Sequence, residues 1–443
     1  MTHAPSDRVE RHVTCLGCGC CCDDLEVTVR GDRIAGMDRA CSLGAAWLRD
    51  GRAPARALMS GAQVPRDEAL ASLARMLASA RRPLVYLTTD VTCEAQKAAV
   101  ALADRLRAAL DNLSSATVSA SVLAAQEIGR ATATLGEIRN RADVVVFWDV
   151  DAARYPRFAE RYAPGPAGLY LREGPQGRRV VSVTVGREAW PGHGAWPGHE
   201  AWPGADRVVR LAPVDETPTL TLWSGLLADP SRARGTGPAW AHAATLLESI
   251  TGGQYVAVVV DAEPAGESAA ARADALCRLS HALNLQARGA LLALRAGGNR
   301  SGAEAVMTAA AGYPMAVDFA DGTPRYRPHD GSAHALVTAR AVDAVLVVGD
   351  GASIDAGSLA ALTDTPCAVI GPAATTGPLA TARIAIDSAR AGVHEAGTAL
   401  RMDDVPIPLR ALLPGPPPAV ELLTILQGLL DDVRSTRAAG PRA

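Results

Sequence analysis

Cysteine is the residue with the clearest chemical pattern in this sequence. Six of the nine cysteines lie within the first 41 residues, and four follow the spacing Cys15-x2-Cys18-x3-Cys22, with Cys41 after eighteen intervening residues. Four thiolates from one tight loop and one later loop are the ligands that a cubane iron–sulfur cluster (4Fe-4S) needs. Gly17 and Gly19 permit the unusual backbone turns that bring three sulfurs to one side of the loop.

Two other interpretations of these four cysteines stay open. Zinc also takes four thiolates, but usually from two Cys-x2-Cys knuckles, and the second knuckle is missing. The surplus Cys20 and Cys21 blur the spacing, so the site could have kept its cysteines and lost its metal. We expect the isolated Cys93, Cys277 and Cys367 to be small core residues and not ligands.

Composition narrows the class of protein. Hydrophobic residues make up 48% and charged residues 21%, which is typical of a globular chain. The formal net charge of −3, with both signs interspersed, indicates neither nucleic acid nor a membrane surface as a partner. The first 14 residues are polar and charged, and no apolar run is long enough to span a bilayer. We therefore expect a cytoplasmic protein, in which disulfides are disfavoured.

The first 55 residues differ from the rest of the chain and predict a cysteine-rich, iron–sulfur-type lobe. The alternation Leu25-Glu-Val-Thr-Val29, followed by a Gly31-Asp32 turn, predicts a β-hairpin. A lobe of this size cannot bury a core of its own, so it needs a cofactor or the neighbouring domain.

Helices and buried strands alternate through the remainder, which favours an α/β fold with two doubly wound parallel sheets. We expect a first domain over 60–235, a second over 236–432 and a flexible tail over 433–443. Strands are predicted at 83–87, 143–148, 179–185, 255–260, 290–294, 344–348, 367–370 and 382–386. Helices are predicted at 67–80, 93–109, 121–128, 268–283, 302–310, 353–362 and 420–430.

A low-complexity insert interrupts the first of these domains. The hexapeptides EAWPGH, GAWPGH and EAWPGA follow one another across 188–205. Each contains Pro-Gly, a turn signal, so we expect an exposed loop with three exposed tryptophans. His193 and His199 could bind a metal in principle, but a slipped repeat without a ligand is the simpler interpretation.

Several segments together resemble the B subunit of formylmethanofuran dehydrogenase, a branch of the molybdopterin oxidoreductases. They follow the order of that family and cover the chain from end to end apart from the insert. The matching stretches are CLGCGCCCDDLEV at 15–27, ACSLG at 40–44, TCEAQKAAVALAD at 92–104, TLGEIRNRADVVVFW at 134–148, NRSGAEAVMTAAAGYPMAVDFADGTPRYRP at 299–328 and GTALRMDDVPIPL at 397–409.

The resemblance implies an iron–sulfur lobe and two α/β domains that grip a molybdopterin guanine dinucleotide carrying molybdenum or tungsten. It also implies that the C-terminal β-barrel of ordinary molybdopterin enzymes belongs to a separate subunit. The pattern is most similar to the B subunit of the bacterial formyltransferase/hydrolase complex of methylotrophs. The partners so implied are an amidohydrolase-like A subunit, a C subunit and a formyltransferase D subunit.

The sequence departs from the family where the metal should be held. The family's ligand is a cysteine or selenocysteine just before the helix that begins near Ser121, and Thr117 stands near that place. A neutral hydroxyl is a poor ligand for a soft metal centre. Asp149 and Asp151 replace a Gly-Asn-Pro type of turn, and we expect both on a solvated loop.

A second candidate site lies where a strand meets a helix. Gly297, Gly298 and Asn299, with Gly302 at the helix start, keep a shape that could receive an anionic cofactor at a helix N-terminus. The alternative is a simple strand-to-helix connection.

We therefore expect a non-catalytic scaffold subunit of a formyltransferase/hydrolase complex. Its pathway would be the one-carbon metabolism, from formaldehyde to formate, that uses tetrahydromethanopterin and methanofuran-like carriers. The rival hypothesis is an active molybdenum or tungsten formylmethanofuran dehydrogenase, an oxidoreductase whose ligand lies elsewhere. A third is a redox-sensing interaction module.

Overall fold

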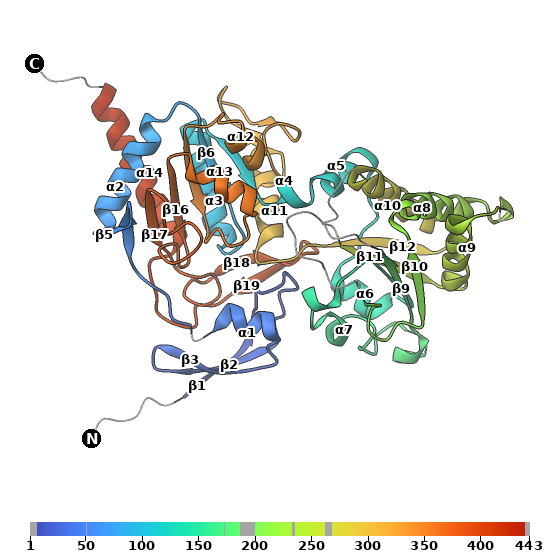
Figure 1. Cartoon of the computed structure of the whole chain (residues 1–443). Helices are drawn as coiled ribbons and strands as arrows, with labels where there is room; N and C mark the ends of the chain where they lie inside the picture. Colours follow the sequence, from blue (N-terminus) through green and yellow to red (C-terminus); the bar gives the residue numbers. More distant parts are fainter. Residues whose placement is uncertain are drawn as a thin grey trace, which may run out of the picture. The chain divides into compact units, whose positions relative to one another are not determined.

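The computed structural model describes residues 7–438 except 50, 172, 187–199, 233–234 and 262–267. The chain forms two compact units. Unit 1 comprises Met1–Ala116 and Gly297–Ala443, and unit 2 comprises Thr117–Ala296. Unit 2 is therefore inserted within the sequence of unit 1, as the colours of Figure 1 show.

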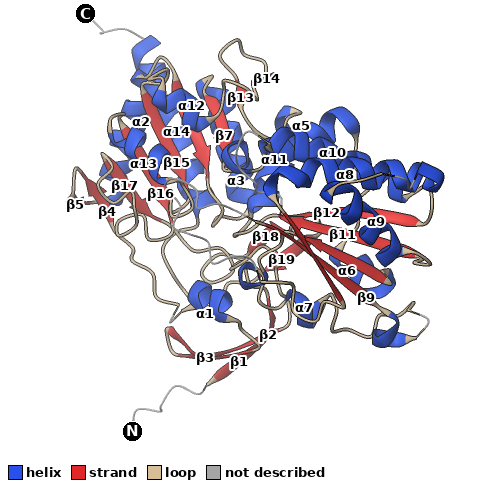
Figure 2. Cartoon of the chain, turned by 45° about the vertical axis from the view of Figure 1, so that its right-hand side comes forward, coloured by secondary structure: helices blue, strands red, loops and turns tan. Residues whose placement is uncertain are grey.

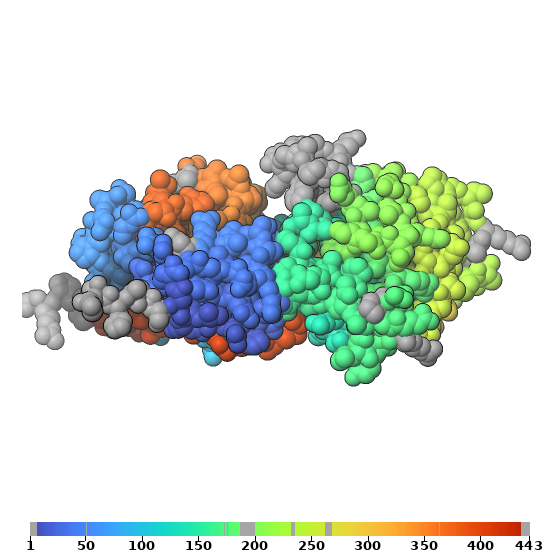
Figure 3. All heavy atoms as spheres, turned by 90° about the horizontal axis from the view of Figure 1, so that it is seen from below, coloured from blue at the N-terminus to red at the C-terminus, as the bar shows by residue number. Residues whose placement is uncertain are grey.

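The N-terminal part of unit 1 is a three-stranded antiparallel sheet followed by a short helix. Its elements are β1 (Arg8–Val13), β2 (Leu25–Arg30), β3 (Arg33–Asp38) and α1 (Ser42–Leu48). Leu25, Val27 and Val29 alternate toward the interior, which is why this segment forms a strand. The predicted hairpin and its turn at Gly31, which has a φ of 62°, are confirmed. Figure 3 shows this lobe in dark blue.

The main sheet of unit 1 has nine strands in the order β14-β13-β7-β6-β15-β16-β17-β4-β5, with a parallel centre from β7 to β17. These strands are β4 (Ala57–Met59), β5 (Ala62–Val64), β6 (Pro83–Leu87), β7 (Ala109–Asn112), β13 (Val317–Asp318), β14 (Arg325–Tyr326), β15 (Ala344–Val348), β16 (Cys367–Gly371) and β17 (Ile384–Asp387). A separate pair is formed by β18 (Gly397–Leu400) and β19 (Pro406–Leu409).

Helices cover both faces of this sheet, as Figure 2 shows. Unit 1 contains α2 (Arg66–Ser79), α3 (Cys93–Leu106), α11 (Arg300–Ala311), α12 (Ala333–Thr338), α13 (Ala356–Thr363) and α14 (Ala419–Ala438), and it shares α4 (Ser114–Thr117) with unit 2. Val85 and Leu87 pack with α2, α3 and α14, whereas Leu84 and Tyr86 pack on the opposite face with α12. Burial on both faces explains why β6 is a continuous apolar run.

Unit 2 is built on a five-stranded parallel sheet in the order β10-β9-β8-β11-β12. The strands are β8 (Val144–Trp148), β9 (Arg179–Val185), β10 (Arg207–Leu211), β11 (Tyr255–Asp261) and β12 (Arg288–Leu294). The α-helices are α5 (Ser119–Ile128), α6 (Leu135–Arg141), α7 (Phe158–Arg161), α8 (Pro213–Ala228), α9 (Pro238–Ile250) and α10 (Ala269–Leu283). Short 3₁₀ turns occur at Ala152–Arg154, Gly174–Gly177 and Pro230–Arg232.

The α/β class and the predicted buried strands are confirmed, but the strands group differently from the expected division at residue 235. β11 and β12 join β8 and β9 in unit 2, whereas β15, β16 and β17 join β6 and β7 in unit 1. Apolar patterning identifies a buried strand but does not specify its neighbour, because sheet order depends on long-range packing. The expected tail is also shorter, since α14 continues to Ala438.

The third hexapeptide of the insert is a loop with an exposed Pro203-Gly204 turn, as predicted, but its tryptophan is buried and not exposed. Trp202 is 2% exposed and stacks on Phe147 with 3.8 Å between ring centroids. Its backbone N–H donates to Ser182 Oγ at 2.9 Å, which ties this segment to β9. The prediction of an exposed tryptophan was wrong because a turn signal describes the backbone and not what the next aromatic ring can cover. The first two copies, with His193 and His199, lie outside the described residues.

Among the described residues, no helix combines the length and the apolar character needed to cross a bilayer.

Candidate functional site

The cysteine loop lies between β1 and β2 and is closed by its own backbone. Cys15 N–H donates to the Cys22 carbonyl at 2.9 Å, and the chain turns at Gly19 and Cys21, whose φ angles are 78° and 43°. All five cysteines of the loop are buried. The sixth, Cys41, is partly exposed and occupies the N-cap of α1.

Three other thiols contribute to the raised pKa of the Cys15 thiol. Burial raises the pKa of the Cys15 thiol to about 12, a hydrogen bond from Gly17 opposes this, and Cys18, Cys22 and Cys41 raise it further. The same four cysteines were chosen from their spacing. A methyl group at Gly44 would lie 3.1 Å from Cys15 Sγ and 3.9 Å from Cys41 Sγ, so α1 brings its own cysteine to the loop through this glycine.

Cys20 and Cys21, which lie outside the predicted ligand set, are also buried and also have raised pKa values. A hydrogen bond with Cys18, followed by burial, raises the pKa of Cys20 well above its ordinary value. Cys21 Sγ lies 4.0 Å from the Leu400 carbonyl, and burial is the main cause of its raised pKa. Cys21 also packs in an apolar cluster with Leu16 and Ala391.

In number and kind, the four thiols that interact around Cys15 fit the donor set of a four-iron cluster. Only the type and number of the donor atoms fit a cluster. Among the described residues, no three His, Cys, Asp or Glu side chains are arranged to hold a metal ion. Since each thiol must lose its proton to become a ligand, metal binding in this buried loop would compete with protonation.

The cysteine loop is anchored on the predicted Gly297–Gly302 turn of unit 1. Gly298 N–H donates to the Leu16 carbonyl at 2.9 Å, and Met402 N–H donates to the Gly19 carbonyl at 3.1 Å. A methyl group at Gly298 would lie 2.3 Å from the Thr89 carbonyl oxygen, which explains the glycine by close packing.

Asn299 of this turn joins several segments of unit 1 through hydrogen bonds. Its side-chain amide donates to the Val91 carbonyl at 3.0 Å, and its Oδ1 accepts from Leu400 N–H at 2.9 Å. Gln96 Nε2 donates to its carbonyl at 3.0 Å. Gly302 leaves room for the Asn299 side chain, because a methyl group there would overlap Oδ1. Of the three glycines predicted to bind a cofactor, Gly297 alone has open space beside its Cα.

Asp111, at the end of β7, fixes the segment that leads to Thr117. Its carboxylate accepts hydrogen bonds from Ala316 N–H at 2.9 Å, Ala333 N–H at 2.6 Å and Ser115 Oγ at 2.5 Å. Burial raises the pKa of Asp111 to about 6, although these bonds oppose the shift. Thr117 is half-buried at the last position of α4.

Buried carboxyl groups lie where the main sheet of unit 1 reverses its winding. β6 leads through α3 to β7 on one side, and β15 leads through α13 to β16 on the other. Doubly wound sheets bind their ligands beyond the carboxyl ends of two such strands. Here Asp90 follows β6, is 3% exposed, and accepts a hydrogen bond from Asp350 N–H at 2.8 Å. Burial, and then the Asp350 carboxylate, hold the pKa of Asp90 well above its ordinary value.

The sheet of unit 2 reverses its winding between β8 and β11, and carboxylates follow both strands. Asp149 is buried and its Oδ1 accepts from Val185 N–H at 3.2 Å, so the expectation of a solvated side chain was wrong for it. Its φ of 52° lies in the left-handed region, which glycine adopts more readily than aspartate. Asp151 caps the following turn, and Asp261 pairs with Arg154 at 2.6 Å.

Sequence reasoning missed Asp90, Asp350 and Asp261. The available signal was an aspartate just beyond the end of a buried strand, as in Gly349-Asp350-Gly351, but a strand-end aspartate is common in turns. Only the pairing of β6 with β15 shows that two of these residues meet.

Fold and site together define a doubly wound α/β protein with an N-terminal cysteine lobe and acidic groups at its two winding reversals. No protein-family model matches the chain. It is, however, a homologue of the B subunit of formylmethanofuran dehydrogenase over nearly its whole length. The B subunit of the tungsten-containing formylmethanofuran dehydrogenase 2 of Methanocaldococcus jannaschii is 29% identical over 439 residues, which are 95% of this chain and 98% of that protein.

A second relative agrees with this relationship, and one solved structure shares the fold. The protein of the same name from Methanococcus maripaludis is 28% identical over 446 residues, 96% of this chain and 99% of that protein. The fold is shared with a chain of the formyltransferase/hydrolase complex (FhcABCD) from Methylorubrum extorquens, solved in complex with methylofuran. That chain matches with a TM-score of 0.70 and 22% identity, over 86% of this chain and 99% of its own length.

Proposed function

We propose that this chain is a non-catalytic scaffold subunit of a formyltransferase/hydrolase complex in one-carbon metabolism. Homology to the B subunit of formylmethanofuran dehydrogenase supports the pathway, and the fold of the Methylorubrum extorquens complex supports the assembly. Its partners are then the amidohydrolase-like, C and formyltransferase subunits, and its location is the cytoplasm. The carriers of the formyl group are tetrahydromethanopterin and a methanofuran-like molecule.

The observation that carries the scaffold role is the carboxyl pair Asp90 and Asp350. A pterin dinucleotide brings a pyrophosphate to the carboxyl ends of the strands, where its charge needs N–H donors or cations. The raised pKa of Asp90 indicates a negative electrostatic potential at this position, because the Asp350 carboxylate contributes to it after burial. A site that already disfavours one negative charge disfavours a pyrophosphate more strongly.

The chemistry at the family's ligand position supports the same conclusion. The sequence contains no cysteine between Cys93 and Cys277, and Thr117 stands near the place of the metal-binding thiolate or selenolate. A threonine hydroxyl stays protonated at neutral pH and binds soft metals poorly.

The second candidate function is an active molybdenum or tungsten formylmethanofuran dehydrogenase. Its support is the set of four interacting thiols, since a pure scaffold has no need of an electron relay, and the 29% identity to a tungsten-containing relative. In that case Gly297 is the glycine of the predicted turn that has open space for the pterin dinucleotide.

Within either function, we assign Cys15, Cys18, Cys22 and Cys41 as ligands of a 4Fe-4S cluster. When bound, such a cluster supplies one-electron transfer. The chain's own contribution is to bury Cys15, Cys18 and Cys22, with Cys41 partly exposed, and to place Gly17 and Gly44 where side chains would intrude.

Metal analysis of the complex purified without oxygen tests both assignments. We expect roughly four iron atoms per chain and neither molybdenum nor tungsten. The Cys41→Ser variant should lose iron, whereas Cys367→Ser, which alters a buried core cysteine of the same unit, should keep it. Stoichiometric molybdenum or tungsten contradicts the scaffold role. Zinc in place of iron contradicts the cluster alone, so the two failures are distinguishable.

A further inference from the structure

The hairpin of β18 and β19 packs on the cysteine loop through the turn that joins its two strands. Met402 N–H of this turn donates to the Gly19 carbonyl at 3.1 Å, and Cys21 Sγ lies 4.0 Å from the Leu400 carbonyl. Val405 of the turn packs against the apolar cluster that contains Cys21. The turn and the loop both belong to unit 1, and they lie against each other.

Arg401 gives this turn a positive charge close to the thiols. Its guanidinium donates two hydrogen bonds to the Asp403 carboxylate, at 2.6 and 2.8 Å. The Arg401 side chain is 13% exposed and that of Asp403 is completely buried. Burial raises the pKa of the Cys21 thiol, Cys15 and Cys18 raise it further, and the positive charge of Arg401 opposes them. Of this ion pair, the guanidinium therefore acts more strongly on the loop than the carboxylate does.

The cysteine loop needs such a charge from a neighbouring segment. Each thiol loses its proton when it binds a metal, and the cysteines of the loop are at most 7% exposed, so water does little to stabilise their negative charges. The loop from Cys15 to Cys22 contains no charged residue of its own. Its backbone supplies one donor, since Gly17 N–H donates to Cys15 Sγ at 3.3 Å. Asp23 and Asp24, which follow the loop, add negative charge and not positive charge.

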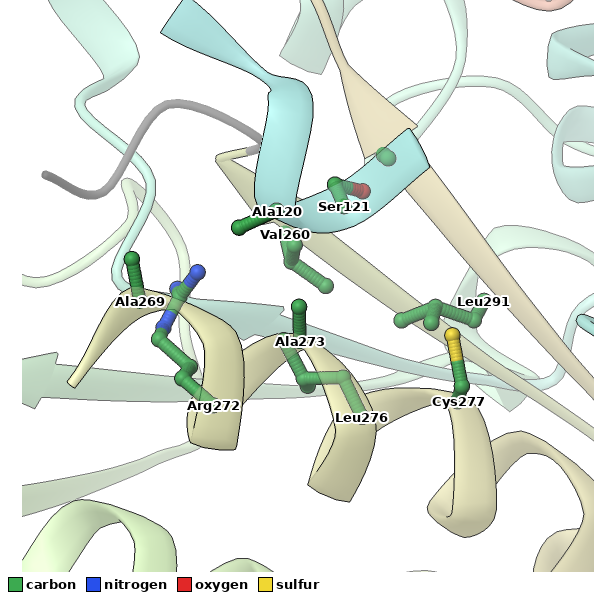
Figure 4. A pocket seen from close by; sticks show the side chains of 10 residues that line it. Ala120, Ser121, Val260, Ala269, Arg272, Ala273, Leu276, Cys277 and Leu291 are labelled. Atoms are coloured by element: carbon green, nitrogen blue, oxygen red, sulfur yellow. The ribbon is translucent and has the colours of Figure 1, made fainter. Parts of the chain in front are cut away.

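An arginine near a cysteine is not sufficient for such a role. In unit 2, Arg272 and Cys277 of α10 line the same small pocket, as Figure 4 shows. Among the described residues, Cys277 packs there with Ala124 and Ala273, without a second thiol. In the lobe, by contrast, Arg401 faces a loop whose thiols also act on one another.

We propose that Arg401 raises the reduction potential of the iron–sulfur cluster assigned to this lobe, and that Asp403 positions its guanidinium and partly offsets its charge. This inference rests on the cluster assignment of the proposed function. An electron added to a cluster with thiolate ligands increases its negative charge, so a nearby positive charge stabilises the reduced form more than the oxidised form. Arg401 acts through space and does not bind the metal, which makes it a positioning residue.

Two substitutions break the same ion pair with opposite changes in charge, and the test is the midpoint potential of the full chain in a spectroelectrochemical titration without oxygen. Arg401→Gln removes the positive charge and should lower the ratio of reduced to oxidised cluster about tenfold at a fixed potential, which is about 59 mV for one electron. Asp403→Asn removes the negative charge and should raise the midpoint. A merely structural role of the ion pair would shift both midpoints in the same direction.

A matched control separates this effect from the loss of any arginine. Arg410→Gln alters an exposed residue just after β19, where solvent screens the charge, and should leave the midpoint unchanged. If Arg401→Gln loses its iron, the direction of the Asp403→Asn shift decides. An unchanged midpoint in Arg401→Gln, or a midpoint of Asp403→Asn that does not rise, overturns the proposal and leaves the cluster assignment standing. A natural chain without iron overturns both.

Discussion

Replacing Asp111 by asparagine tests how the segment that leads from β7 to Thr117 is held. The carboxyl group is fully buried, and burial raises its pKa from an ordinary 3.8 to about 6. A carboxyl whose pKa is higher in the folded than in the unfolded state stabilises the fold while it is protonated. This contribution is complete below the unfolded pKa and is lost as the pH rises through the folded pKa.

The size of the effect follows from these two values. A shift of about two pKa units is worth about 3 kcal/mol in total at 1.36 kcal/mol per unit. As the pH rises from 4.5 to 7, ionisation of Asp111 should therefore lower the free energy of unfolding by about 2 kcal/mol. Asparagine cannot titrate, so the variant lacks this dependence. It also places an amide donor against one of two backbone N–H groups, which costs about 1–3 kcal/mol at every pH.

Urea unfolding of both proteins across this pH range provides the measurement. The difference in free energy of unfolding should increase by about 2 kcal/mol as the pH falls from 7 to 4.5, because other titrating groups cancel. A difference that stays constant with pH would show that Asp111 is already ionised throughout. The three accepted hydrogen bonds would then outweigh burial, and our reasoning about this carboxylate would be refuted.

Three further substitutions have defined outcomes. Trp202→Ala should cost about 3–5 kcal/mol of stability in urea unfolding, because its ring stacks on Phe147; a loss under 1 kcal/mol would contradict its burial. Arg178→Met should cost at least about 2 kcal/mol by the same assay, because its guanidinium donates to backbone carbonyls at the ends of α6 and α7; an unchanged midpoint would refute this role. Gly17→Ala should lower the iron content because a methyl group would lie 2.7 Å from a backbone oxygen, whereas Gly36→Ala meets only an ordinary contact and should not. Equal iron in these two variants would count against the lobe geometry.

Local patterns in the sequence determined much of the fold. The runs that became β6, β8, β9 and β15 were recognisable because strands buried on both faces are continuously apolar. β7 was missed, because its four residues, Ala109–Asn112, are too short and too polar to show the pattern. Spacing also predicted that the cysteines of the N-terminal loop and Cys41 lie together, and the thiols of Cys15, Cys18, Cys20, Cys21, Cys22 and Cys41 do interact.

The tertiary structure decided which of these elements belong together. β15 pairs with β6, more than 250 residues earlier in the chain, and this pairing places Asp350 against Asp90. No local signal marks either aspartate, because each is an ordinary turn residue until the sheet order is known. Trp202 likewise has only a Pro-Gly turn signal beside it in the sequence, and its burial depends on packing against Phe147. Residue type and spacing set what each segment can form, whereas long-range packing sets which groups meet.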